Sequence, residues 1–76
     1  MKTVHISLKS INDVKEFVEI TNRYDCDVDL SSGRYIVDGK SIMGIFSLNL
    51  TKPIKVDVYS DDDAGLLGDI GKFVVE

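Results

Sequence analysis

The sequence is short of several residue types, and each shortage excludes a class of protein. A single cysteine, Cys26, has no partner for an internal disulfide and cannot build a cysteine zinc cage. No apolar run approaches the roughly 18 residues that a membrane-spanning helix needs. The first residues lack the apolar stretch of a signal peptide. We therefore expect a cytoplasmic protein that neither spans nor enters a membrane.

Basic residues are also in deficit. Nine Lys and Arg stand against thirteen Asp and Glu, which gives a net charge of −4 at pH 7, and the basic residues are scattered along the chain. Nucleic-acid binders gain most of their affinity by neutralising phosphates, so direct nucleic-acid binding is not expected. The aspartates at residues 61–63 lack the spacing of a calcium loop. They are typical of a helix cap and first turn, and we expect no metal and no cofactor.

What remains is an ordinary globular composition, with 43% hydrophobic and 29% charged residues. The length of 76 residues predicts one small domain over residues 1–76. Alternation of apolar and polar residues predicts strands over residues 4–8, 26–30, 35–37 and 54–59. Ser31, Ser32 and Gly33 are typical of a hairpin turn between the second and third of these strands.

Three helices are expected between and after the strands. Ser10 precedes Val14, Phe17, Val18 and Thr21 at helical spacing, which predicts an N-capped helix ending near residue 22 or 23. Ser41 is the expected cap of a short helix that carries Ile42, Met43, Ile45 and Phe46. The last helix is expected after residues 61–63. It is expected to be weak, because Gly65, Gly68 and Gly71 each disfavour helix. Their regular spacing would allow this helix to pack closely on the sheet, and the chain is expected to fray near Glu76.

The order of the elements is therefore β-α-β-β-α-β-α. Two split βαβ halves with the helices on one face of the sheet make an α+β open-faced sandwich. Pattern alone leaves the strand order undecided, and a ferredoxin-like order fits as well as any other.

Two segments carry a resemblance to a known family. Residues 23–30 (RYDCDVDL) followed by residues 39–45 (GKSIMGI) resemble HPr, the small histidine phosphocarrier of the bacterial sugar phosphotransferase system. The resemblance extends over nearly the whole chain, although the last helix is short. It implies a four-stranded antiparallel sheet in the order 1-4-2-3. It also implies that Ser41 occupies the position of the family's regulatory serine, the target of an ATP-dependent HPr kinase.

The family's catalytic element departs from this likeness. Its Gly-x-His-x-Arg-Pro pattern falls on residues 8–13, where the sequence reads LKSIND. Ser10 then stands at the histidine position, Asn12 at the arginine position and Asp13 at the proline position. A serine phosphoester is too stable to be passed on, whereas a histidine phosphoramidate is reactive. Because no arginine remains to pair with phosphate, we expect the relay to be lost and Ser10 to act as a helix cap.

Ser41 and the residues after it are the remaining candidates. A phosphate on Ser41 would add about −1.5 to −2 charges next to the helix that Ser41 caps. The apolar residues of so short a helix cannot all face inward, so part of the set is expected to form an exposed patch. In the family this helix contacts partners, which makes Ile42, Met43 and Phe46 the expected contact residues.

The resulting hypothesis is an HPr-like interaction module, not an enzyme, that is regulated by phosphorylation of Ser41. It is similar to the catabolite-repression HPr homologue, and its expected partners are an HPr kinase-like kinase and a transcriptional regulator or metabolic enzyme. One alternative is a true phosphocarrier that uses another residue such as His5. The other is an interaction module that is never phosphorylated.

Overall fold

A computed structural model describes residues 1–60 and 64–75, so the predicted cap at residues 61–63 and the predicted fraying at Glu76 lie outside the described residues. The strands are β1 (Lys2–Ile6), β2 (Asp27–Ser32), β3 (Tyr35–Asp38) and β4 (Ile54–Tyr59). The helices are α1 (Ile11–Asn22), α2 (Ile42–Phe46) and α3 (Ala64–Asp69), and a 3₁₀ turn follows at Gly71–Phe73. The predicted order of elements is confirmed.

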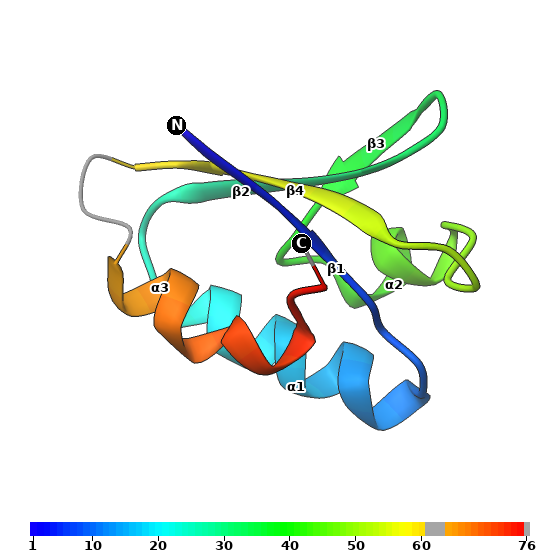
Figure 1. Ribbon diagram of the computed structural model, residues 1–76, viewed down its shortest axis with the longest axis horizontal. Coiled ribbons are helices and arrows are strands. Elements are labelled where there is room, and N and C mark those ends of the chain that lie inside the picture. The colour runs from blue at the N-terminus through cyan, green and yellow to red at the C-terminus, as the bar shows by residue number, and fades with distance from the viewer. Residues whose placement is uncertain (61–63, 76) are drawn as a thin grey trace.

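The four strands form one antiparallel sheet in the order β1-β4-β2-β3, as the resemblance implied. All three helices lie on one side of this sheet (Figure 1). The α+β open-faced sandwich is therefore confirmed, and the strand order that pattern alone left undecided is fixed by the antiparallel pairing of β4 with both β1 and β2.

The core lies between the sheet and the helices. In β4, Ile54, Val56 and Val58 are fully buried because strand alternation turns all three toward the helices. The rest of the buried hydrophobic core comes from every other helix and strand except β3, and from the connecting segments: Ile6, Leu8, Val14, Phe17, Ile20, Val28, Leu30, Ile45, Leu48, Leu66, Ile70 and Phe73.

Several predicted boundaries were wrong by a few residues. The first strand covers Lys2–Ile6 and not residues 4–8, although Leu8 beyond its end is still buried. The second strand begins after Cys26 and continues through Ser31 and Ser32, which were expected in the turn. The turn itself consists of Gly33 and Arg34, between the paired residues Ser32 and Tyr35. Backbone pairing, which the side-chain pattern does not report, sets these limits.

The C-terminal segment is held against α1 by particular side chains. The Phe17 and Phe73 rings meet edge to face with their centroids 6.1 Å apart.

The three glycines near the C-terminus differ in their surroundings. A Cβ at Gly65 would lie 3.2 Å from the Tyr24 hydroxyl oxygen, whereas nothing lies within 4 Å of one at Gly68 or Gly71. The expected glycine stripe against the sheet is therefore wrong, since only Gly65 allows a close approach, and that approach is to a tyrosine.

Candidate functional site

Ser10 caps the start of α1. Its backbone is extended (φ −146°, ψ 166°), and its hydroxyl oxygen accepts a hydrogen bond of 3.1 Å from the backbone N–H of Asp13. In return, the Asp13 carboxylate accepts one of 2.9 Å from the backbone N–H of Lys9. The two bonds are similar to a capping box, except that the carboxylate accepts from the residue before the cap and not from the cap itself. Ser10 therefore acts as the N-cap of α1, as the sequence predicts.

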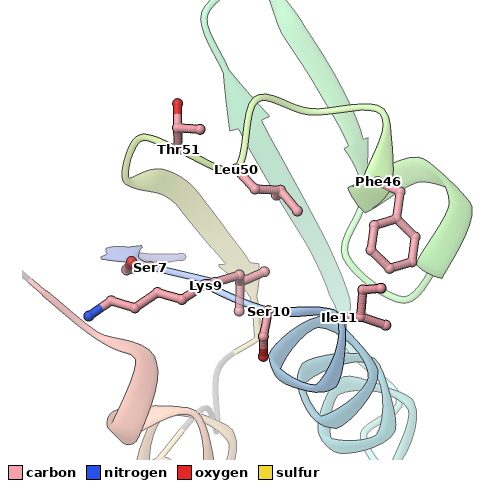
Figure 2. A pocket seen from close by; sticks show the side chains of 8 residues that line it. Ser7, Lys9, Ser10, Ile11, Phe46, Leu50 and Thr51 are labelled. Atoms are coloured by element: carbon pink, nitrogen blue, oxygen red, sulfur yellow. The ribbon is translucent and has the colours of Figure 1, made fainter.

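A hollow of about 550 Å³ opens beside this cap (Figure 2). It is formed where the start of α1 meets the end of α2 and the segment that follows α2, and its lining residues are Ser7, Leu8, Lys9, Ser10, Ile11, Phe46, Leu50 and Thr51. Three hydroxyls and one ammonium supply its polar groups, while the remaining side chains are apolar. Neither a histidine nor an arginine is among these eight residues.

Ile11 is a component of this site that sequence reasoning missed. Its spacing from Val14 and Val18 places it on the same stripe of α1 as these apolar residues, and this spacing gives no sign of exposure. In the structure 62% of its surface is exposed, and its side chain points toward the Phe46 ring at the rim of the hollow (Figure 2). Ile11 is the first residue of α1, and no pattern in the sequence distinguishes it from the buried members of the stripe.

His5 lies away from the hollow. It is in β1 opposite Lys55 of β4, and strand alternation turns it to the face of the sheet opposite the helices, since its neighbour Ile6 is fully buried among them. The imidazole and the start of α1 are therefore on different sides of the sheet.

Ser41 caps α2 in the same way that Ser10 caps α1. Its hydroxyl oxygen accepts a hydrogen bond of 3.1 Å from the backbone N–H of Gly44, and the residue is half-buried. A Cβ at position 44 would lie 3.2 Å from the Cβ of Val37 and 3.3 Å from the Ser41 hydroxyl oxygen. Glycine at position 44 therefore lets α2 lie close to β3 and to its own cap.

The segment before Ser41 is hydrogen-bonded to the end of α1. The Thr21 hydroxyl donates a buried hydrogen bond of 2.9 Å to the carbonyl of Gly39. The Asn22 side-chain amide donates one of 3.2 Å to the carbonyl of Lys40. The Lys40 ammonium in turn donates one of 2.5 Å to the carbonyl of Tyr24, just beyond the C-terminus of α1. A cation at this end of a helix is favourable because of the helix dipole.

Tyr24 extends this connection to α3. Its hydroxyl donates a hydrogen bond of 2.5 Å to the carboxylate of Asp69. That bond, together with some desolvation, raises the pKa of the Tyr24 phenol above its ordinary value. The loop between α1 and β2 thus contacts both the residue before Ser41 and the last helix.

The apolar residues of α2 divide between the core and the surface. Ile45 is fully buried, whereas Met43 is 76% exposed and Phe46 is 40% exposed. Ile42 is half-buried and borders a second groove, of about 650 Å³, with Lys15, Val18, Glu19, Asn22 and Arg23 of the α1 region. The structure brings Phe46 together with Ser10 at the first hollow. Ser41 and Met43 line neither depression, and Asn12 is exposed on α1 outside both.

Two negative findings concern the part of the chain that the structure describes. Residues 1–60 and 64–75 contain no group of three or more histidine, cysteine, aspartate or glutamate side chains placed to hold a metal ion. Within the same residues no helix has the length and apolar character needed to cross a bilayer.

Comparison with known proteins agrees with this architecture. The crystal structure of HPr-C-His from Thermoanaerobacter tengcongensis superimposes with a TM-score of 0.80 at 24% identity, covering 95% of this chain and 89% of that one. The crystal structure of a phosphocarrier protein HPr from Bacillus anthracis str. Ames gives a TM-score of 0.72 at 27% identity, covering 96% and 93%. No curated protein matches the sequence. The profile of the family described as "PTS HPr component phosphorylation site" matches residues 5–74, and the chain therefore belongs to the HPr family of the phosphotransferase system.

Proposed function

We propose that this HPr-family protein does not relay phosphate through the start of α1 and acts instead as a regulatory interaction module, switched by phosphorylation of Ser41. The observation that carries the proposal is the pair of helix caps. A serine caps α1 at the position that resemblance assigns to the family's histidine, and a second serine caps α2 within the family's regulatory signature. In this proposal the protein is not an enzyme and works in the cytoplasm as one domain over residues 1–76.

The chemistry at the start of α1 supports loss of the relay. The Ser10 hydroxyl needs a base before it can attack phosphorus, and the nearest carboxylate, that of Asp13, is hydrogen-bonded to the Lys9 backbone. A negative charge in the first turn also repels an incoming phosphoryl group. Asn12, at the family's arginine position, has no charge with which to pair a phosphate through two parallel hydrogen bonds. A phosphoserine formed there would be a stable ester rather than a donor.

The position of Ser41 supports a switch. The residue is half-buried at the edge of α2, next to the exposed Met43, while Phe46 and Ile11 continue the apolar surface toward the Ser10 hollow. A phosphate on Ser41 would add about −1.5 to −2 charges beside this apolar patch. A partner that contacts Met43, Phe46 and Ile42 and also carries a cation would then discriminate between the two forms. A transcriptional regulator or a metabolic enzyme is the proposed partner.

The direct test is incubation with an HPr kinase and ATP, followed by mass spectrometry. We expect one phosphoryl group on the wild type and on Ser10→Ala, and none on Ser41→Ala. Ser10→Ala is the matched control, because it removes a serine helix cap with the same 3.1 Å hydrogen bond. Circular dichroism would establish that both variants fold. An unmodified wild type, or a Ser41→Ala variant that still gains phosphate, would overturn the proposal.

Loss of the relay has its own assay. The protein is incubated with phosphoenolpyruvate and the first enzyme of the phosphotransferase system, and acid-labile phosphate is measured. We expect none. Acid-labile phosphate that disappears in a His5→Ala variant would establish the alternative phosphocarrier function. Partner binding that does not change in Ser41→Asp would instead establish a module that is never switched.

A further inference from the structure

A third depression lies at the far end of the β2–β3 hairpin, apart from Ser10 and Ser41. It has a volume of about 390 Å³ and is lined by Ser32, Gly33, Arg34, Tyr35, Ser47, Asn49 and Lys52. The tip of the hairpin and the segment after α2 form its walls, and both lie toward the same end of the sheet (Figure 1). Two of its residues are cations and none is acidic. We call it the hairpin hollow.

The hairpin turn fixes the backbone that carries one of the two cations. Gly33 has φ +61° while Arg34 keeps a negative φ, and Ser32 pairs with Tyr35 on either side of them. A two-residue turn with positive φ only at its first central position is type II′, and glycine is favoured there. Arg34 therefore stands at the second position of a tight turn, and Tyr35 follows it with 71% of its surface exposed.

The opposite wall offers a second cation and hydrogen-bond donors. The side-chain oxygen of Asn49 accepts bonds of 3.1 Å from the backbone N–H and 2.5 Å from the hydroxyl of Thr51. The oxygen of the amide is thus occupied, and its two N–H groups are left to donate. Ser47 is not among these donors, because its N–H and its hydroxyl both donate to the carbonyl of Gly44 in α2.

Both cations of the hairpin hollow are available. Among residues 1–60 and 64–75, salt bridges engage Lys55 with Asp57 and Lys72 with Glu16, and none engages Arg34 or Lys52. In a chain of net charge −4, two such cations gathered in one hollow without a carboxylate in its lining produce a local positive potential.

We propose that the hairpin hollow binds the phosphate group of a phosphate monoester. Such a group is close to a dianion at pH 7, so it matches two cations better than a carboxylate does. The planar guanidinium of Arg34 can pair with two phosphate oxygens, and the ammonium of Lys52 acts as a point charge. The exposed ring of Tyr35 offers a flat surface for the organic part of the ester. Neither the relay position nor the Ser41 switch is involved.

The test is an NMR titration of the intact protein with phenyl phosphate at physiological ionic strength. We expect saturable shifts in the amides of residues 32–35 and 47–52. Arg34→Gln and Lys52→Gln should each weaken binding about ten-fold, as expected for loss of a charge-assisted hydrogen bond. The matched control is Lys2→Gln, which removes the same charge from an exposed position on β1 and should change affinity by less than about two-fold because distant charges are screened.

Further ligands establish what is recognised. Phenyl sulfate, a monoanion of the same shape, should bind more weakly, and binding of phenyl phosphate should weaken at about pH 5, where the ester loses its second charge. A short phosphoserine peptide that binds more tightly than phenyl phosphate would assign the group to a modified protein, and the reverse would assign it to a small molecule. Equal affinity for the sulfate, equal loss in Lys2→Gln, or shifts outside the hollow would overturn the proposal.

Discussion

Replacing Gly39 by alanine should destabilise the domain strongly. A Cβ at this position would lie 2.7 Å from Cγ1 of Val28 and 3.0 Å from its carbonyl oxygen. The backbone cannot retreat freely, because the N–H of Gly39 donates a 2.6 Å hydrogen bond to that same carbonyl and its own carbonyl accepts from Thr21. The added methyl group must therefore displace a central strand or break these bonds.

The expected cost follows from the two effects. Overpacking of a well-packed interior costs about 1–3 kcal/mol, and loss of a hydrogen bond costs about 1 kcal/mol. A total of about 2–4 kcal/mol lowers the melting temperature by about 8–32 °C in a domain of this size, at about 4–8 °C per kcal/mol.

The measurement is thermal and urea unfolding followed by circular dichroism, with Gly68→Ala as the matched control. Nothing lies within 4 Å of a Cβ at Gly68, which is in α3, so alanine there should stabilise by up to about 1 kcal/mol through helix propensity. If both substitutions changed the free energy of unfolding by the same amount, the close approach of Gly39 to Val28 would not be the cause.

Three further predictions rest on single hydrogen bonds. Thr3→Ala should lower the free energy of unfolding by about 1–2 kcal/mol in urea titrations, because it removes the 2.6 Å bond to the nearly buried Asp57; no change would mean that water replaces the hydroxyl. Asp69→Asn should move the raised pKa of Tyr24 down toward its ordinary value, as measured by phenolate absorbance. Because the folded pKa is the higher one, this stabilisation is present below about pH 10 and is lost as the pH rises through the folded pKa. Ser10→Ala should cost about 1 kcal/mol in thermal unfolding as a lost helix cap; a negligible cost would mean that Ser10 has another role.

The fold was largely predictable because its signals are local. Alternation in β4 and the spacing of Val14 and Phe17 in α1 identify elements whose buried faces the structure confirms. Strand limits were less predictable, since Ser31 and Ser32 are polar residues that extend β2 only through their pairing with β3. Residue type favours a turn there, and cross-strand hydrogen bonds override that preference.

The candidate site was predictable only in part. Both serine caps were found from sequence because a cap depends on neighbouring residues in the chain. The exposure of Ile11 and the presence of Arg34 and Lys52 at one hollow depend on segments that are distant in the sequence. Periodicity and charge counts describe single segments, so they do not show which distant segments lie next to each other in the fold.

Under the proposed switch, the attachment of the residues before Ser41 to α1 determines how a kinase must approach. With the carbonyls of Gly39 and Lys40 held by Thr21 and Asn22, this serine is presented on a rigid backbone and not on an extendable loop. An enzyme that reads its target as an unwound peptide would first have to break those bonds and uncover Val28. Selection would therefore favour an enzyme that docks on the intact domain, and short synthetic peptides spanning the serine should be poor substrates.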